Sequence, residues 1–218
     1  QCRKSSTHFL RYRDGLEMSA LIHIIRHGRT SANDKRLYCG STDISLSENG
    51  IREILEFKES GIYPEADLFI TSGMKRAVET LRLIYGDIDH VVMEDLREYC
   101  FGDFEMQSHY ELESRHDYQK WIADEKGDVC CPRGESRNGF YHRIFRGFEE
   151  ALREIEKRKA SSAVIVCHGG VIAAVMSRLF TDEKGFYGWQ PKYGLGYTLH
   201  CSGGEITAYQ DIDSHKAR

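Results

Sequence analysis

The stretch ALIHIIRHG, residues 20–28, decides the class of fold. Its first part, Ala20–Ile25, is apolar and β-branched, which is typical of a strand buried on both faces, and the Arg-His-Gly that follows predicts a turn. Ala163–Cys167 repeats this pattern and ends at His168 and two glycines, and Leu68–Thr71 is a shorter run of the same kind. Continuous apolar strands of this type indicate a parallel sheet with both faces covered.

Amphipathic helices are expected between these strands. The segment SENG, residues 47–50, leads into a helix with apolar residues at helical spacing, and Ser72 is predicted to cap the helix that follows Leu68–Thr71. Phe140–Arg158 is a long charged amphipathic helix, and a further helix runs from the glycines after His168 to Phe180. The remaining strands are expected at His90–Met93, Tyr197–Cys201 and Glu205–Tyr209. Strands that alternate with helices predict an α/β fold of three layers, with a mostly parallel central sheet and helices on both of its faces.

The chain of 218 residues suits one large domain. Residues 1–17 have no hydrophobic periodicity and are expected to be a flexible extension, although an ordered arm packed on the domain also fits them. Residues 18–218 are then a single domain. Between about 106 and 140 the composition turns polar and mixed, which predicts a cap-like helical excursion outside the sheet. Its aromatic residues either pack into the core, the more common role, or form a lid over a substrate: Tyr110, Tyr118 and Trp121.

The composition argues against several classes of protein. Lys and Arg number 30 against 34 Asp and Glu, a net charge of −4, which is unlike a nucleic-acid-binding domain. The longest apolar runs, Ala163–Cys167 and Val171–Met176, are much shorter than the ~20 residues of a membrane span. Residues 1–20 carry several charges and no apolar block, unlike a signal peptide. The seven scattered cysteines predict free thiols, and together these features predict a cytoplasmic protein.

Arginine and histidine side chains follow three of the predicted strands. They are Arg26 and His27 after the first strand, Arg76 in the helix after Leu68–Thr71, and His168 after Ala163–Cys167. Because ligands bind beyond the carboxyl ends of parallel strands, we expect these side chains on one rim of the sheet. Two guanidinium groups suit the oxygens of a phosphoryl group, and the glycines at 28, 169 and 170 allow a close approach of the backbone.

No nucleotide-binding loop, zinc-protease motif or calcium loop accompanies this set. The arginines and one histidine must then balance the charge of a transferring phosphoryl group, so no metal and no cofactor are expected. The other histidine, in its neutral form, is a suitable nucleophile toward phosphorus. Taken singly, each of these residues also fits a structural role, and the combination carries the prediction.

Several segments, in order along the chain, resemble the histidine phosphatase superfamily, which has the phosphoglycerate-mutase-like fold. LIHIIRHGRTSAN, residues 21–33, resembles the signature R-H-G-x-T-x-x-N. The others are GSTDISLSENG at 40–50, TSGMKRAVET at 71–80, LREYCFGDFE at 96–105, Gly134-Glu135-Ser136, and VCHGG at 166–170. Gly73 stands where the family pattern has proline, and Met106 stands where it has glycine.

The resemblance implies a role for each matching residue. His27 would be the nucleophile, and Glu98 would donate a proton to the leaving group. The same carboxylate could then activate the water that cleaves phosphohistidine. Three further carboxylates lie close to Glu98 in the sequence and compete for this role: Asp95, Asp103 and Glu105. The phosphate pocket would be formed by Arg26, Arg76, His168 and Gly169, with Thr30 and Asn33 as polar supports.

Threonine at position 30 and the short middle section resemble the phosphatase branch of this family, in particular α-ribazole phosphatase and bacterial broad-specificity phosphatases. The expected activity is hydrolysis of a small phosphate ester through phosphohistidine, with α-ribazole 5′-phosphate as one candidate substrate. Two alternatives stay open, a phosphoglycerate mutase and a non-catalytic phosphate-binding module. The expected partner is a small phosphorylated substrate, with no nucleic acid and no membrane, for a chain that is a monomer or a homodimer.

Overall fold

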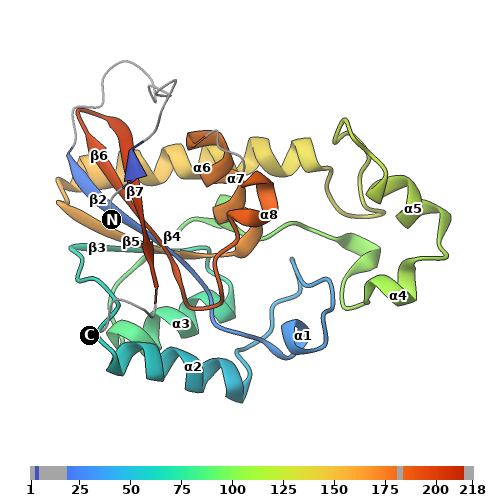
Figure 1. Cartoon of the computed structure of the whole chain (residues 1–218), viewed down its shortest axis with the longest axis horizontal. Helices are drawn as coiled ribbons and strands as arrows, with labels where there is room; N and C mark the ends of the chain where they lie inside the picture. The colour runs from blue at the N-terminus through green and yellow to red at the C-terminus, as the bar shows by residue number, and fades with distance from the viewer. Residues whose placement is uncertain (1–2, 5–18, 181–183, 214–218) are drawn as a thin grey trace.

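One sheet runs through the part of the chain that the computed structural model describes, which is residues 3–4, 19–180 and 184–213. Within these residues the sheet has seven strands in the order β1-β7-β6-β2-β5-β3-β4 (Figure 1). Their bounds are β1 Arg3–Lys4, β2 Ala20–Arg26, β3 Leu68–Thr71, β4 Val91–Val92, β5 Ser162–Cys167, β6 Gly196–Ser202 and β7 Glu205–Ile212.

The centre of the sheet is parallel. β5 lies between β2 and β3, and β4 continues the parallel set to the edge. On the other side of β2, β6 and β7 form an antiparallel hairpin, and β1 pairs with β7. The predicted α/β class is confirmed, and the hairpin makes the sheet mixed. In the register, Arg26 lies opposite Cys167 and Thr71 lies opposite Val166, so the three central strands end at one level.

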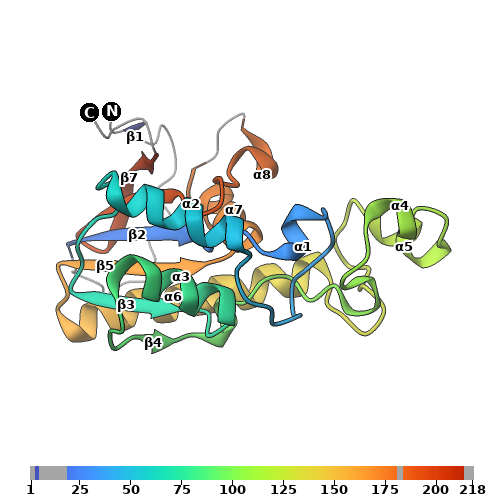
Figure 2. The same ribbon diagram turned by 90° about the horizontal axis from the view of Figure 1, so that it is seen from below.

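Helices cover both faces of this sheet. Their bounds are α1 Ser31–Asp34, α2 Glu48–Glu59, α3 Lys75–Tyr85, α4 His109–Leu112, α5 His116–Ile122, α6 Arg137–Arg158, α7 Gly169–Leu179 and α8 Gly185–Gly188, with short 3₁₀ turns at Glu94–Leu96 and Gly102–Phe104. Figures 1 and 2 show α2 and α3 on one face and α6 and α7 on the other. The side chains of β2 alternate between the two cores, because Ile24 packs in the cluster of α6 and α7 while Ile25 packs with Leu81 of α3.

The start of α3 differs from the sequence prediction. The helix begins at Lys75, with Met74 at the N-cap position and no side-chain cap, so the prediction that Ser72 caps it was wrong. The Ser72 hydroxyl instead lies 2.8 Å from Nε2 of His168, which follows the neighbouring strand β5, and it accepts only a long contact of 3.5 Å from the N–H of Met74. A buried imidazole requires a hydrogen-bond partner, and the short contact with His168 supplies it.

The polar stretch between 106 and 140 lies beyond one end of the sheet, where α4 and α5 project (Figures 1 and 2). Its aromatic residues take three different positions. Tyr118 is buried in the core, Trp121 is half-buried, and Tyr110 is exposed. The core role therefore holds for Tyr118, while Trp121 is available to a ligand.

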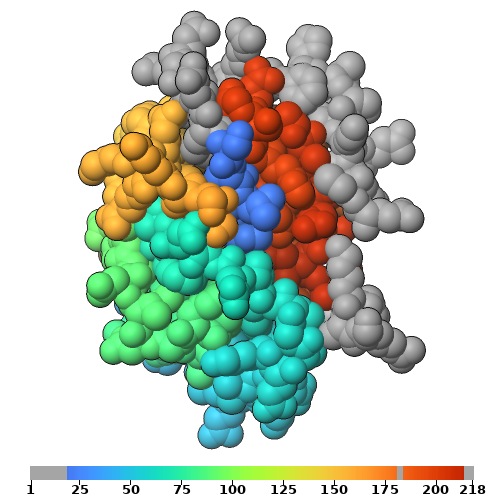
Figure 3. Space-filling model, turned by 90° about the vertical axis from the view of Figure 1, so that its left-hand side faces the viewer, coloured from blue at the N-terminus to red at the C-terminus, as the bar shows by residue number. Residues whose placement is uncertain are grey.

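Figure 3 shows the opposite end of the molecule, where the start of β2 lies between the connection from α6 to β5 and the β6–β7 hairpin. Most of the extension predicted for residues 1–17 lies outside the described residues. Only Arg3 and Lys4 are described, as β1, opposite Tyr209 and Ala208. Among the described residues, every helix is too short or too polar to cross a bilayer.

Candidate active site

The residues predicted for one rim of the sheet meet where β2, β3 and β5 end. Arg26 is the last residue of β2, His27 follows it, and His168 follows β5. The rings of His27 and His168 lie with their centroids 5.0 Å apart, at an interplanar angle of 63°. Arg76, from the first turn of α3, is buried beside them with only 1% of its surface exposed. The structure therefore brings all four side chains to one place.

His27 is held in the form that a nucleophile needs. Its Nδ1 lies 2.7 Å from the carbonyl oxygen of Gly28, and because a carbonyl only accepts, Nδ1 carries the hydrogen. The other nitrogen, Nε2, then keeps its lone pair. Burial lowers the pKa of His27 well below 6.5, and the charges of Arg76 and Arg26 lower it further. The ring is therefore neutral at pH 7.

The two arginines are fixed by backbone carbonyls. Arg76 donates from Nη1 to the Thr42 carbonyl (2.9 Å) and from Nη2 to the Gly40 carbonyl (2.6 Å). Arg26 donates from Nη1 to the Pro191 carbonyl at 2.8 Å, and its Cζ lies 3.8 Å from the centre of the Tyr193 ring. These contacts orient both guanidinium groups.

Three buried nitrogens at this site have no hydrogen-bond partner within the described protein: Nε of Arg26, Nε of Arg76 and Nδ1 of His168. Buried polar groups in proteins are almost always paired, so these atoms point to a ligand with several acceptor oxygens. Nδ1 of His168 carries the hydrogen when the Ser72 hydroxyl donates to Nε2 at 2.8 Å. Burial, followed by the charge of Arg76, also lowers the pKa of His168 well below 6.5. A phosphate group fits this set of donors.

Glu98 reaches the same site from the segment that follows the first 3₁₀ turn. Its carboxylate accepts from the backbone N–H of Tyr99 and from that of Gly170, both at 2.9 Å. A side chain at Gly170 would collide with this carboxylate, and one at Gly169 would come within 2.8 Å of Cζ of Arg26. Both glycines thus allow the start of α7 to pack against charged groups of the protein, rather than directly against a ligand.

The three other carboxylates considered for the proton-donor role have different partners from Glu98. Asp95 pairs with Arg146 at 2.6 Å, and Asp103 pairs with Arg133. Glu105 accepts from the backbone N–H groups of residues 40–42 and 101. A cavity of about 470 Å³ opens beside Arg26, and of the four carboxylates only Glu98 lines it.

Thr30 and Asn33 form the start of α1. The backbone N–H and the hydroxyl of Thr30 donate to Oδ1 of Asn33 at 3.0 and 2.9 Å, in a capping box. The Thr30 hydroxyl is therefore used inside the loop, and Thr30 does not line the cavity. Asn33 does line it, and its amide nitrogen is available there.

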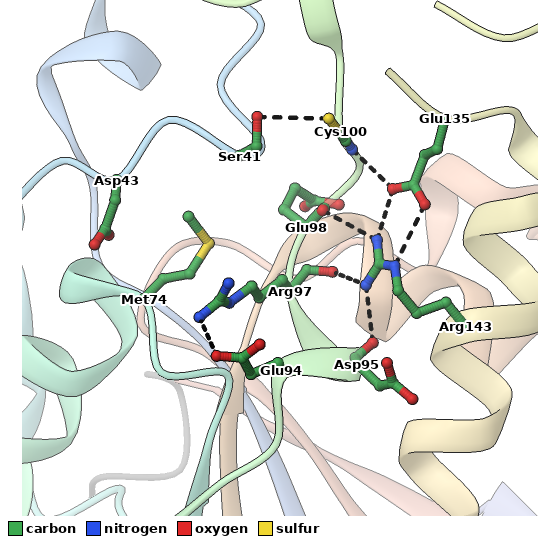
Figure 4. Close-up of a pocket in the computed structure, with 10 residues that line it drawn as sticks. All are labelled: Ser41, Asp43, Met74, Glu94, Asp95, Arg97, Glu98, Cys100, Glu135 and Arg143. Atoms are coloured by element: carbon green, nitrogen blue, oxygen red, sulfur yellow. Dashed lines mark hydrogen bonds and ion pairs between the residues drawn. The ribbon is translucent and has the colours of Figure 1, made fainter. Parts of the chain in front are cut away.

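The large cavity has a volume of about 470 Å³ and extends from Arg26, Asn33 and Glu98 toward the excursion. Its wall is aromatic, formed by Tyr38, Tyr99, Phe101, Trp121, Phe140, Tyr141, Phe186, Tyr187 and Tyr193. Of this wall, sequence reasoning offered only Trp121, as part of a lid, and it missed the contact of Ser72 with His168 and that of Tyr193 with Arg26, because these partners lie far apart in the chain. A second cavity of about 360 Å³ is also lined by Glu98 (Figure 4).

Both departures from the family pattern have left-handed backbone. Gly73 has φ of +76°, which proline cannot adopt because its ring fixes φ near −65°. Met106 has φ of +59°, the conformation for which glycine is favoured. The loop after β3 therefore follows a different path from one with proline at this position, while Met106 keeps a backbone suited to glycine.

Comparisons with known proteins agree with this geometry. A sequence model of the histidine phosphatase superfamily (branch 1) matches residues 22–207. The chain is 31% identical over 162 residues to an adenosylcobalamin/α-ribazole phosphatase from Salmonella typhimurium, which covers 72% of this chain and 78% of that protein. It is 29% identical over 165 residues to a 2,3-bisphosphoglycerate-dependent phosphoglycerate mutase from Cytophaga hutchinsonii, covering 73% and 76%.

A solved structure shows the same relationship in three dimensions. The crystal structure of the α-ribazole phosphatase from Shigella flexneri has a TM-score of 0.78 and 26% identity, and the match covers 89% of this chain and 96% of that one. The residues that the family model matches include His27 and His168, whose rings meet on the rim of the sheet. The chain belongs to the histidine phosphatase superfamily.

Proposed function

We propose that this protein is a phosphomonoesterase that works through a phosphohistidine at His27 and needs no metal. The observation that carries this proposal is the set of three unpartnered buried nitrogens beside a neutral His27. Two arginines balance the charge of the phosphate oxygens, a task that a metal ion performs in other phosphoryl-transfer enzymes.

The first step forms the phosphoenzyme. Nε2 of His27 attacks phosphorus, the bond from phosphorus to the ester oxygen breaks, and the electron pair of that bond leaves on the oxygen. Glu98 in its protonated form donates a proton to this oxygen, so an alcohol departs. In the second step the Glu98 carboxylate takes a proton from water, whose oxygen attacks phosphorus. The nitrogen–phosphorus bond breaks, and inorganic phosphate is released with His27 restored.

The wall of the cavity supports an ester whose alcohol carries a planar aromatic group. Beyond Arg26, the charged residues that line it are Glu98, Asp124 and Arg137. Arg137 already donates to the carbonyls of Asp124 (2.8 Å) and Glu125 (2.6 Å). Aromatic rings, in contrast, suit stacking on a flat group. α-Ribazole 5′-phosphate, the ester of a nucleoside with a planar base, is therefore our leading candidate.

A phosphoglycerate mutase is the second candidate, because relatives of that name share the fold and the expected phosphohistidine step. A mutase must also hold the carboxylate and the second phosphate of a bisphosphate. Since the aromatic wall offers few free cations for those groups, we place the mutase second.

The test is phosphate release from an aryl phosphate, from α-ribazole 5′-phosphate and from 3-phosphoglycerate, with a chelator present. We expect turnover of the first two esters and an acid-labile phosphoryl group on the protein, and we expect both to vanish in His27→Ala. Interconversion of phosphoglycerates much faster than phosphate release would establish the mutase instead. Binding of phosphate with no turnover of any ester would contradict this proposal and support a non-catalytic phosphate-binding module.

We also propose a cytoplasmic location. The six cysteines within the described residues are free thiols, which supports a reducing compartment, and Cys2 lies outside the described residues. Fractionation of cells that express the full chain tests this, and recovery outside the cytoplasm would contradict it.

A further inference from the structure

We propose that the ion pair between Arg143 and Glu135 is a positioning device for Glu98. This inference depends on the proton-donor role of Glu98 proposed above. Arg143 and Glu135 line the smaller cavity, and Glu98 is the single residue that lines both cavities (Figure 4). The pair makes no described hydrogen bond to His27 or to the two arginines of the proposed phosphate site, so its contacts reach the reaction through Glu98, while the charge of Arg143 also helps to lower the pKa of His168.

Arg143 holds the backbone from which Glu98 projects. Its Nη1 donates to the carbonyls of Asp95 (2.9 Å) and Arg97 (2.8 Å), and its Nη2 donates to the carbonyl of Glu98 (3.3 Å). Residues 97–101 belong to no helix or strand, so their backbone groups must find partners elsewhere. One planar guanidinium supplies several of these partners from the rigid helix α6.

Glu135 completes the clamp on the other side of Glu98. Its Oε1 accepts from Nη2 of Arg143 at 2.6 Å and from the backbone N–H of Cys100 at 2.8 Å. The backbone N–H of Glu135 also donates to the carbonyl of Cys100 at 3.0 Å. The backbone of Glu98 is therefore fixed directly and on both sides. Only 22% of the Arg143 side chain and 19% of the Glu135 side chain are exposed, which limits screening of the pair by solvent.

Fixed backbone matters here because a proton donor must lie within hydrogen-bond reach of the leaving oxygen. The Glu98 carboxylate is tied to the protein by two backbone N–H groups, from Tyr99 and Gly170. A shift of residues 97–100 would move Tyr99 and Glu98 away from Gly170. The clamp thus acts on proton donation, and it makes no described hydrogen bond to Arg26 or Arg76.

The test compares two esters that differ in their need for a proton. The leaving group of a simple alkyl phosphate is a strongly basic alkoxide, whereas the leaving group of 2,4-dinitrophenyl phosphate is a stable phenolate. The quantity measured is kcat/KM, because it reports the steps up to phosphorylation of His27 and is independent of the later hydrolysis. The variants are Arg143→Met and Arg143→Lys. The lysine keeps the charge, but its single ammonium cannot reach three carbonyls and a carboxylate together.

Arg146→Met is the matched control. Arg146 also lies on α6 and also binds Asp95, but it bonds only to the carboxylate of Asp95, at 2.6 Å, and its side chain is 69% exposed. It donates to no backbone group near Glu98. Glu98→Gln is the reference variant, because it removes the proton itself.

We expect both Arg143 variants to lose about 10- to 100-fold in kcat/KM for the alkyl ester and less than about threefold for the dinitrophenyl ester, a fraction of what general acid catalysis contributes. Glu98→Gln should show the same selectivity, and Arg146→Met should match the wild type on both esters. An equal loss on both esters, or a lower melting temperature with an unchanged ratio of the two kcat/KM values, would show that Arg143 is only structural. If the wild type cleaves neither ester, the proposed function fails, and this inference fails with it.

Discussion

At the scale of single residues, we expect the protonation of His27, the proposed nucleophile, to set the pH range of the reaction. Burial and two neighbouring arginines lower the pKa of His27, so its neutral form persists to lower pH than in an ordinary histidine. A histidine with the usual pKa of about 6.5 is roughly three-quarters protonated at pH 6. We expect the ring of His27 to be neutral there, and the acid limb of kcat/KM to lie below pH 6.5 once the ionisation of the ester is subtracted. NMR of the imidazole nitrogens measures this directly, and a midpoint near 6.5 would contradict it.

A second residue-scale prediction concerns the contact between Gly170 and Glu98. In Gly170→Ala the new methyl group would collide with the Glu98 carboxylate and displace it. A displacement of the order of 1 Å in a reacting group costs about 100-fold in rate. We therefore expect kcat/KM for an alkyl phosphate to fall by about that factor. The control is Gly139→Ala on α6, where the methyl group meets nothing closer than the Ser136 hydroxyl at 3.4 Å. Equal activity of the two variants would disprove the contact.

At the scale of elements, the loop of residues 40–42 connects Glu105 to the phosphate site. The Glu105 carboxylate accepts from three successive N–H groups of this loop and from the hydroxyl of Thr42 at 2.6 Å. The loop in turn offers the carbonyls of Gly40 and Thr42 to Arg76. Glu105 therefore positions Arg76 without touching the phosphate site.

We expect Glu105→Ala to weaken the binding of inorganic phosphate about tenfold, because the loop of residues 40–42 loses the carboxylate that holds it and hydrogen bonds to a charged group are worth about 1.5–3 kcal/mol. Isothermal titration with phosphate measures this. Glu111→Ala removes another carboxylate that accepts from backbone, in the capping box of α4 with Ser108, and it should leave phosphate affinity unchanged. Wild-type affinity in Glu105→Ala would show that Arg76 does not depend on this loop.

At the scale of the whole molecule, three buried histidines link stability to pH. Burial lowers the pKa of His23 from 6.5 to about 4, with a further contribution from His200, and the pKa values of His27 and His168 are also lowered. In the unfolded chain these groups have pKa values near 6.5. Below that pH the unfolded chain binds protons that the folded chain does not. Stability is therefore complete above about pH 6.5 and is lost as the pH falls toward 4.

The expected slope is about 1.4 kcal/mol per pH unit for each histidine within this window. Chemical denaturation between pH 7 and 5 measures it, in a range where most carboxylates stay ionised. The Thr198 hydroxyl lies 2.9 Å from Nδ1 of His23, and His23→Gln keeps a polar partner for it. This variant should reduce the slope by the contribution of one histidine. A free energy of unfolding that is the same at pH 7 and pH 5 would contradict the linkage.

Much of this molecule follows from local patterns, and the parts that do not are tertiary. The apolar runs of β2, β3 and β5 predict buried strands, and the turn residues after them place His27 and His168 on one rim. Strand order has no local signal, so the position of β6 beside β2 could not be predicted from alternation alone. The same holds for Ser72, which was expected to cap a helix.

The candidate site divides in the same way. Residues in short motifs after strands could be named from the sequence, and the structure brings Arg26 and His27 together with Arg76 and His168. Tyr193 and Arg143 could not, because each acts on a residue far away in the chain. Their partners are fixed by the packing of loops and of α6, which no periodicity encodes.

The place of β6 and of the segment before it has a consequence for how the protein is made. β2 is synthesised well before β6, yet it pairs along its length with β6. Arg26 obtains its carbonyl acceptor from Pro191 and its stacking partner from Tyr193. On the ribosome, a nascent chain therefore carries an incomplete phosphate pocket until these late residues emerge, and long-range pairing of this kind makes folding slow. A polypeptide released before Pro191 would have His27, His168 and both arginines, but Arg26 would lack the carbonyl and the aromatic ring that orient it.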